Sequence, residues 1–291
     1  MTAAVLDRII DKLSFLGPWG EVLHNWLAKL GTISGPRAGP AKDFLNGTWL
    51  GHPIHPPLTD VPIGAWMGAS VLDLADGGQG GGLGKGADVL VALGCAGAVA
   101  AAMTGLADWQ DQYGRGRDLG TAHALINTGA LALCSASLVL RLKGARGPAI
   151  GLSLLGLGAA ATGGFVGGDM VFRMGVQVNR NAFSSGPKKW TAVAAEDEVV
   201  EGTFIRKQVG NSQVLLTRLN GEICAASAIC SHAGGSLDEL PLEGGQLHCP
   251  WHGSQFELRT GQVVHGPATV AIPVFDTRTN EGQVEIRVPQ P

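Results

Sequence analysis

The sequence predicts a multidomain fold, in which an α-helical membrane bundle of four transmembrane helices is followed by an all-β domain. Only 15% of the 291 residues are charged, and the long uncharged stretches all lie in the first two thirds of the chain. From Trp190 onward, short β-rich runs alternate with glycine-containing turns. This change predicts four parts, namely residues 1–50, 51–178, 179–189 and 190–291.

The first part, residues 1–50, predicts one or two amphipathic N-terminal helices. Between Val5 and Leu30, apolar side chains recur at helical spacing, with an interruption at Gly17-Pro18. Helices of this kind lie on membrane surfaces, although packing against the bundle accounts for the pattern equally well. The start of the chain lacks the apolar core and cleavage site of a signal peptide, so we expect no cleaved leader.

The second part contains stretches long enough to cross a membrane. A hydrocarbon core of about 30 Å requires roughly 20 apolar residues, and Val89–Ala107 contains no charged residue at all. Soluble helices of this length normally show a polar face, which is almost missing here. The first span is the weakest, because it contains Asp60 and Asp73. The expected spans are 57–76, 88–107, 120–141 and 148–169.

Lysine and arginine residues predict the orientation of the bundle, because they accumulate on the cytoplasmic side of membranes. With four spans, the two termini share one side, which has eight basic residues near the membrane against four on the other. The eight are Arg37, Lys42, Arg115, Arg117, Arg173, Arg180, Lys188 and Lys189; the four are Lys85, Arg141, Lys143 and Arg146. We therefore expect a multi-pass protein of the cell membrane, with both termini and the β domain in the cytoplasm. The linker, residues 179–189, spans at most about 36–40 Å.

Two cysteines and two histidines in the β-rich part form two short pairs. Cys230 and His232 make the first pair, and Cys249 and His252 make the second pair. This donor set suits either zinc or a 2Fe–2S cluster with chemically unequal irons. Zinc fingers usually pair Cys with Cys and His with His along the chain, whereas here each pair has one of each. The pattern therefore favours the cluster, with one ligand from each loop on each iron.

The residues around these pairs resemble a known family. The runs CSHAGGSL, CPWHGSQFELRTG and HGPAT are similar to the two cluster loops and the covering proline loop of Rieske domains, over about Trp190–Val288. The resemblance implies that Cys230 and Cys249 bind the inner iron. It implies that His232 and His252 bind the outer iron, with imidazole edges facing a partner. Around these ligands it places a supporting set, which is Gly253, Ser254 and Pro267.

The resemblance also implies a subtype. Rieske proteins of cytochrome bc complexes have an additional disulfide between the loops, but Gly235 and Trp251 occupy those positions here. The high-potential group offers a Ser and a Tyr hydroxyl to the cluster sulfurs, and this chain has Ser254 but Phe256. We therefore expect a ferredoxin-type centre toward the low end of roughly −150 to +300 mV. A Rieske oxygenase large subunit is excluded, because no two-His, one-carboxylate iron site follows His252.

The membrane part contains further candidate ligands. His52 and His55 precede the first span, where prolines predict a shaped loop, and His123 opens the third span, on the same helix face as Asn127. Ionisable groups at membrane spans often mark function. Three interpretations remain open: a b-type haem held by two of the three histidines, a quinone held by hydrogen bonds, or a polar network that ties the helix ends together.

A second resemblance covers the membrane part. The runs GHPIHPPLTDVPIGAW, TGLADW, TAHALINTG and GGDMVFRMGVQV resemble an uncharacterised four-helix membrane family that is often joined to a Rieske domain. That resemblance implies an integral-membrane fold and no chemistry. A net charge of −3 makes nucleic acid an improbable partner, and the oligomeric state stays open.

Two functions follow from these patterns. The first is a membrane-anchored carrier of single electrons between a cytoplasmic donor and a membrane acceptor, either quinone or haem. Such a chain is a component of an oxidoreductase system rather than an enzyme by itself, and its partners are the lipid bilayer and a redox protein. The second is a redox sensor, an iron sensor or a structural cluster on a membrane scaffold.

Overall fold

The computed structural model describes residues 17–34 and 38–290, which belong to two compact units. The first unit consists of Met1–Gly35 and Ile54–Val176, and the second consists of Pro36–Pro53 and Gln177–Pro291. The chain thus leaves the first unit and returns to it. The part of the expected N-terminal helices that precedes Gly17 lies outside the described residues.

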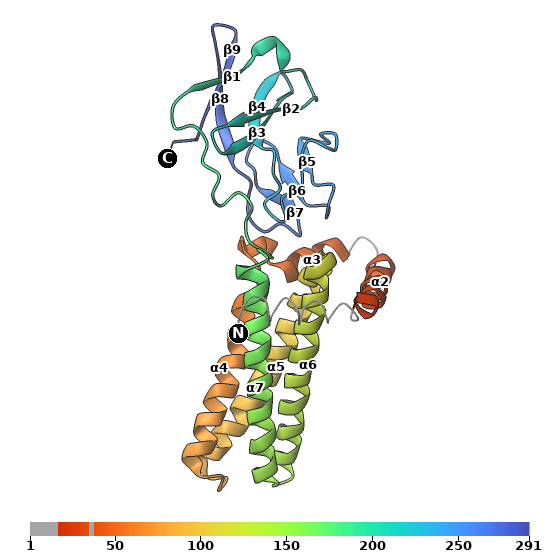
Figure 1. Ribbon diagram of the computed structural model, residues 1–291, viewed down its shortest axis with the longest axis vertical. Helices are drawn as coiled ribbons and strands as arrows, with labels where there is room; N and C mark the ends of the chain where they lie inside the picture. The colour runs from red at the N-terminus through yellow and green to blue at the C-terminus, as the bar shows by residue number, and fades with distance from the viewer. Residues whose placement is uncertain (1–16, 35–37, 291) are drawn as a thin grey trace. The chain divides into compact units, whose positions relative to one another are not determined.

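The first unit is helical. Its helices are α2 (Gly17–Ser34), α4 (His55–Asp76), α5 (Gly82–Trp109), α6 (Gly114–Leu142) and α7 (Arg146–Phe172). Figure 1 shows α4 to α7 side by side as a bundle. Helix α4 packs mainly on α5, and α6 packs mainly on α7, so that the bundle consists of two helical hairpins.

Three helices of the described residues, α5, α6 and α7, are long and apolar enough to cross a membrane. The sequence predicted four such spans. The remaining helix, α4, has 22 residues and packs in the bundle, but it contains Asp60, Asp73 and Asp76 and has no stretch as apolar as those of the other three. The predicted class, a helical membrane bundle followed by an all-β domain, is confirmed.

Small residues bring the helices of each hairpin close together. A Cβ atom added to Gly94 of α5 would lie 2.3 Å from the Trp66 ring of α4, and one added to Gly156 of α7 would lie 2.5 Å from Cys134 Sγ of α6. Such contacts let backbones approach where lipid provides no hydrophobic drive for helix association.

Within the described residues, the second unit combines a short helical segment with nine strands. The helical segment consists of α3 (Ala38–Asn46) and the 3₁₀ turn η3 (Thr48–Leu50). The strands are β1 (Thr191–Ala195), β2 (Ile205–Val209), β3 (Ser212–Leu219), β4 (Glu222–Ser227), β5 (Gln246–His248), β6 (Gln255–Glu257), β7 (Val263–His265), β8 (Val274–Asn280) and β9 (Gln283–Arg287). The six-stranded sheet has the order β1-β9-β8-β4-β3-β2, and the small sheet has the order β5-β6-β7. Neighbouring strands are antiparallel in both sheets.

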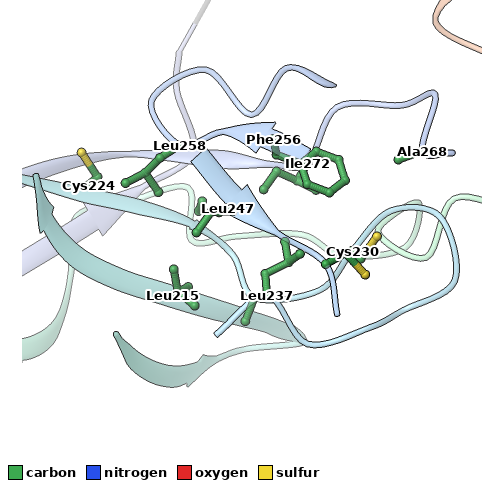
Figure 2. Packing of buried hydrophobic residues seen from close by; sticks show 12 residues of the cluster. Leu215, Cys224, Cys230, Leu237, Leu247, Phe256, Leu258, Ala268 and Ile272 are labelled. Atoms are coloured by element: carbon green, nitrogen blue, oxygen red, sulfur yellow. The ribbon is translucent and has the colours of Figure 1, made fainter. Parts of the chain in front are cut away.

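An apolar core lies between the larger sheet and the small one. Leu215 of β3, Leu247 of β5 and Phe256 of β6 are fully buried in it. Figure 2 shows these side chains together, with Cys224 and Cys230 in the same cluster. Cys224 therefore packs as a small apolar side chain of a strand, whereas Cys230 lies in the loop that follows β4. The core fixes the bases of the loops that carry the candidate ligands.

Candidate functional site

Two loops with the same backbone pattern carry the four candidate ligands of the second unit. In the first loop, the Cys230 N–H donates to Gly235 O (2.9 Å) and the Gly234 N–H donates back to Cys230 O (3.1 Å). In the second loop, the Cys249 N–H donates to Ser254 O (2.8 Å) and the Gly253 N–H donates back to Cys249 O (3.0 Å). Each loop therefore turns its cysteine inward in the same way.

A glycine in the left-handed conformation closes each of these turns. The φ angles are +91° at Gly234 and +78° at Gly253, a region that residues with a Cβ atom rarely adopt. Gly253 was predicted to support the site, and its contribution is this turn. Gly234 has the same place in the first loop, four residues after the cysteine, but the sequence analysis did not single it out.

The ligand side chains form two pairs rather than one group of four. The Nδ1 atoms of His232 and His252 are 3.2 Å apart, and their ring centroids are 4.8 Å apart. The two cysteine sulfurs are linked by a hydrogen bond, and both residues are buried, with 1% and 2% exposed for Cys230 and Cys249. Among the described residues, no three His, Cys, Asp or Glu side chains surround one point that suits a single metal ion.

This pairing fits a two-iron cluster better than a zinc ion. Two nitrogens bound at 2.0–2.1 Å to one tetrahedral metal are separated by about 3.3–3.4 Å, close to the observed 3.2 Å between the imidazoles. A zinc ion would need all four side chains around one centre. In a Rieske centre the Cys pair and the His pair belong to different irons, as the two pairs are arranged here.

The electrostatics of the pocket favour metal-binding protonation states. Burial lowers the pKa of His232 to about 3, and His252, Lys42 and Arg180 lower this pKa further. His232 is therefore neutral at physiological pH, as a ligand must be. A hydrogen bond from the Cys230 thiol lowers the pKa of Cys249 to about 6, with additional help from the backbone N–H groups of Trp251 and His252. The same hydrogen bond, together with burial, raises the pKa of Cys230.

A third loop, which follows β7, packs beside the two ligand loops. Ala268 N–H donates to the buried Ser254 hydroxyl (3.0 Å), and the Ser231 hydroxyl donates to Val270 O (2.6 Å). Pro267, predicted to belong to the covering loop, follows Gly266 through a cis peptide bond. Because Ser254 uses an oxygen lone pair for Ala268, its hydroxyl hydrogen remains available for a cluster sulfur.

The short helix α3 also holds this third loop, which the sequence analysis did not foresee. The carboxylate of Asp43 accepts hydrogen bonds from Gly266 N–H (2.8 Å) and from His265 Nδ1–H (2.6 Å). A Cβ atom on Gly266 would lie 2.9 Å from Asp43 Oδ1 and 3.0 Å from Thr48 Oγ1. No sequence signal links Asp43 to His265, because the two residues are 222 positions apart.

The start of the linker binds the first loop in a similar way. Arg180 N–H donates to Ser231 O (3.0 Å), and the Asn181 side chain donates to Ile229 O (2.9 Å). Together with these contacts, the loop leaves His232 only 6% exposed. This differs from the expectation that both imidazole edges face outward.

The cysteine pattern agrees with the expected absence of a disulfide between the loops. All five cysteines, each within the described residues, are free. A Cβ atom on Gly235 would lie 3.1 Å from the Trp251 ring, so these two positions face each other without a sulfur atom on either side.

The helical unit brings together two of the three histidines singled out in the membrane part. His55 and His123 have ring centroids 6.2 Å apart at an interplanar angle of 79°. The structure places His55 at the first residue of α4 and not in the expected loop, because Pro56 and Pro57 are tolerated in the first turn of a helix. His52 belongs to the second unit, where its ring is exposed and hydrogen-bonds to Pro53 O (2.9 Å).

Comparisons with known proteins cover both parts of the chain. Residues 189–276 match the Rieske [2Fe-2S] domain, and residues 51–180 match a family described as a predicted membrane protein (DUF2231). Ferredoxin CarAc of Metapseudomonas resinovorans is 33% identical over 98 residues, which are 33% of this chain and 92% of that protein. The anthranilate 1,2-dioxygenase ferredoxin subunit of Burkholderia cepacia is 31% identical over 34% of this chain and 93% of its own length.

A solved structure matches over the same region. It is a complex of reduced oxygenase and oxidized ferredoxin in carbazole 1,9a-dioxygenase, with 30% identity over 35% of this chain and 97% of the matched chain, at a TM-score of 0.33.

Proposed function

Because the chain belongs to the Rieske [2Fe-2S] family and has a DUF2231 membrane domain before the Rieske domain, we propose that it is a membrane-anchored carrier of single electrons. Electrons pass between a cytoplasmic donor and an acceptor in the membrane. The observation that carries the proposal is the convergence of a buried Cys pair and a His pair, each with one member from each loop. The relatives named as ferredoxins of dioxygenase systems support the same chemistry.

Each residue has a definite role in this proposal. Cys230 and Cys249 would hold one iron, and His232 and His252 would hold the other; the cluster would supply one-electron chemistry. Backbone N–H groups of His232 and Ala233 on one sulfur, and of Trp251 and His252 on the other, stabilise the thiolates. Gly253 shapes the second loop, and Ser254 fastens the loop that contains Pro267. Because Phe256 has no hydroxyl to offer the sulfurs, we expect a low potential within the Rieske range.

We further propose that α4 is a fourth span, with both termini and the Rieske domain on the cytoplasmic side. Its packing against α5 along the bundle and the bias of Lys and Arg support this topology. The membrane acceptor is either a quinone or a haem.

Anaerobic reduction of the purified full chain tests the proposal. We expect the EPR signal of a reduced 2Fe–2S cluster, with about two non-haem irons and two acid-labile sulfides per chain. Cys249→Ser should abolish the signal, because a hydroxyl does not replace a thiolate ligand. His248→Ala is the matched control, since His248 precedes Cys249 but has no place in either ligand pair, and it should keep the cluster. Colourless protein with one zinc per chain would contradict the proposal.

One observation favours a second candidate function. With His232 only 6% exposed, a redox partner has limited access to one of the outer ligands. A cluster that senses redox state or iron, or that only stabilises the fold of the domain, does not need such access. Stopped-flow mixing with a small reductant and with membrane quinol distinguishes the two: a carrier exchanges electrons reversibly with the membrane, and a sensor or structural cluster does not.

A further inference from the structure

The two histidines of the helical unit lie where its two hairpins meet. His55 starts α4 in the first hairpin, and His123 lies in α6 of the second hairpin. Their ring planes are nearly perpendicular, at 79°, with centroids 6.2 Å apart. The contact therefore joins the two halves of the bundle, which otherwise pack mainly within themselves.

Each imidazole is held in the same way by its own hairpin. His55 Nδ1–H donates to Ala101 O on α5 (2.8 Å), and His123 Nδ1–H donates to Gly163 O on α7 (3.0 Å). A backbone carbonyl only accepts hydrogen bonds, so the proton of each neutral ring is on Nδ1. Each Nε2 atom therefore has a lone pair, and that of His123 lies 3.3 Å from Asn127 Nδ2.

A glycine lies against each of the two imidazole rings. A Cβ atom on Gly105 would lie 2.6 Å from His55 Cε1, and a Cβ atom on Gly167 would lie 3.0 Å from His123 Cε1. Both glycines are four residues after the carbonyl that anchors the ring, on the same helix face. The two hairpins thus present two equivalent, preorganised imidazoles to each other.

The hydrogen bonding determines which ligand can use these lone pairs. The carbonyls of an oxidised quinone need hydrogen-bond donors, but both Nδ1–H groups are already used by the backbone. A metal needs lone pairs, and histidines that bind metals typically donate the other ring N–H to a carbonyl, as here. Asn127 Nδ2 lies 3.3 Å from His123 Nε2, and it also donates to His123 O at 2.9 Å, so that the amide keeps a partner when the lone pair is taken.

The number of ligands selects the kind of metal centre. Among the described residues, no third His, Cys, Asp or Glu completes a site for a bare ion with this pair. A haem iron needs only axial ligands from the protein, because the macrocycle supplies the other four nitrogens. If both Nε2 atoms pointed at one iron, two metal–nitrogen bonds of about 2 Å and two half-rings of about 1.1 Å would place the ring centroids about 6.2 Å apart. The observed separation is 6.2 Å.

We propose that His55 and His123 bind one b-type haem between the two hairpins, as axial ligands through their Nε2 atoms. As the membrane acceptor of electrons, this haem rests on the function proposed above. Haem binding itself depends only on the helical unit.

The test uses the full chain, purified in detergent from cells supplied with a haem precursor. We expect about one haem per chain by pyridine haemochromogen assay, with the low-spin spectrum of two imidazole ligands. His55→Ala and His123→Ala should each lower haem per chain at least tenfold. His52→Ala is the matched control and should keep the wild-type spectrum. The EPR signal of the cluster should persist in all three variants, so that loss of haem is distinguished from failure of the Rieske centre.

Several results would overturn the proposal. These are a wild-type chain that contains no haem and takes up no added haemin, a high-spin five-coordinate spectrum, or bound haem in both alanine variants. Quinone in the lipid extract of a haem-free chain would overturn it as well. If His55→Ala is not recovered folded, His55→Asn serves instead, because its amide nitrogen takes the place of Nδ1 and keeps an N–H for Ala101 O. A bis-imidazole spectrum in this variant would contradict the assignment.

Discussion

The two ends of the helical unit bury polar groups in opposite ways. At one end, Arg141 donates to Asp73 and to Asp88 (2.9 Å to each), and it also contacts Ser137 and Ser153. Its side chain is 0% exposed, and that of Asp73 is 1% exposed. At the other end, His55 and His123 satisfy one ring nitrogen each through the backbone. Each histidine precedes its counterpart, Asp73 or Arg141, by 18 residues, or about 27 Å along a helix.

The difference separates a structural network from a binding site. In the Arg141 network the donors of the guanidinium meet acceptors, and a buried ion pair of this kind is retained only with such complete partnering. In the histidine pair, fixed tautomers leave lone pairs that no carbonyl can use. Variants at the two ends should therefore differ in stability.

The largest expected effect is at the end of the helical unit that contains the Arg141 network. Arg141→Ala should lower the free energy of unfolding by about 3–5 kcal/mol, because Asp73 stays buried and keeps only the longer contact to Arg146 (3.3 Å). The melting temperature in detergent measures the loss. Arg173→Ala is the control, since its partly exposed pair with Asp169 contributes only about 0–1 kcal/mol. Equal melting of the two variants would show that the Arg141 network has no structural role.

The second unit also contains a carboxylate, Asp43, that accepts hydrogen bonds from within the protein. Asp43→Asn should cost about 1.5–3 kcal/mol, because the hydrogen bonds from Gly266 and His265 lose their charged acceptor. We also expect faster loss of the cluster, measured by the decay of its visible absorption. Asp238→Asn, at an ion pair with Arg206 in the same unit, is the control and should leave the cluster lifetime unchanged.

A smaller, steric effect is expected at the end of the helical unit that contains His55 and His123. Gly105→Ala should cost about 1–3 kcal/mol, because its Cβ atom would overlap the His55 ring. Gly64→Ala, whose Cβ atom meets nothing within 4 Å, should be neutral or stabilising by about 0.4–1 kcal/mol. Melting temperatures and haem spectra of the two variants give the comparison. Identical melting temperatures and haem spectra would mean that the missing Cβ atom of Gly105 is not needed to accommodate the His55 ring.

The smallest expected effect is the loss of an imidazole itself. In haem-free protein, His55→Ala should cost only about 0.5–1.5 kcal/mol, the contribution of one hydrogen bond to Ala101 O. Melting of the haem-free variant beside Arg141→Ala measures the contrast directly. A loss as large as that of Arg141→Ala would indicate that the histidine pair is itself a structural network.

The sequence was sufficient for the parts of the molecule that rest on local patterns. The apolar runs predicted α5, α6 and α7. The spacing of Cys230, His232, Cys249 and His252 predicted that two loops bring these side chains together, and their binding of iron stays a prediction. Contacts between distant segments have no local signature. For this reason the binding of Asp43 to Gly266, and the carbonyls that fix His55 and His123, required the three-dimensional arrangement. His52 looked equivalent to His55 in sequence, but only His55 joins the helix.

The contact between Asp43 and His265 also has a consequence for how the chain is made. The ribosome completes α3 early, whereas His265 follows 222 residues later. At 5–20 residues per second, translation of that interval takes roughly 10 to 45 s. During this time the Asp43 carboxylate is solvated by water, and the bundle can insert before the Rieske domain exists. A segment that is made later therefore completes the packing of one that is made earlier.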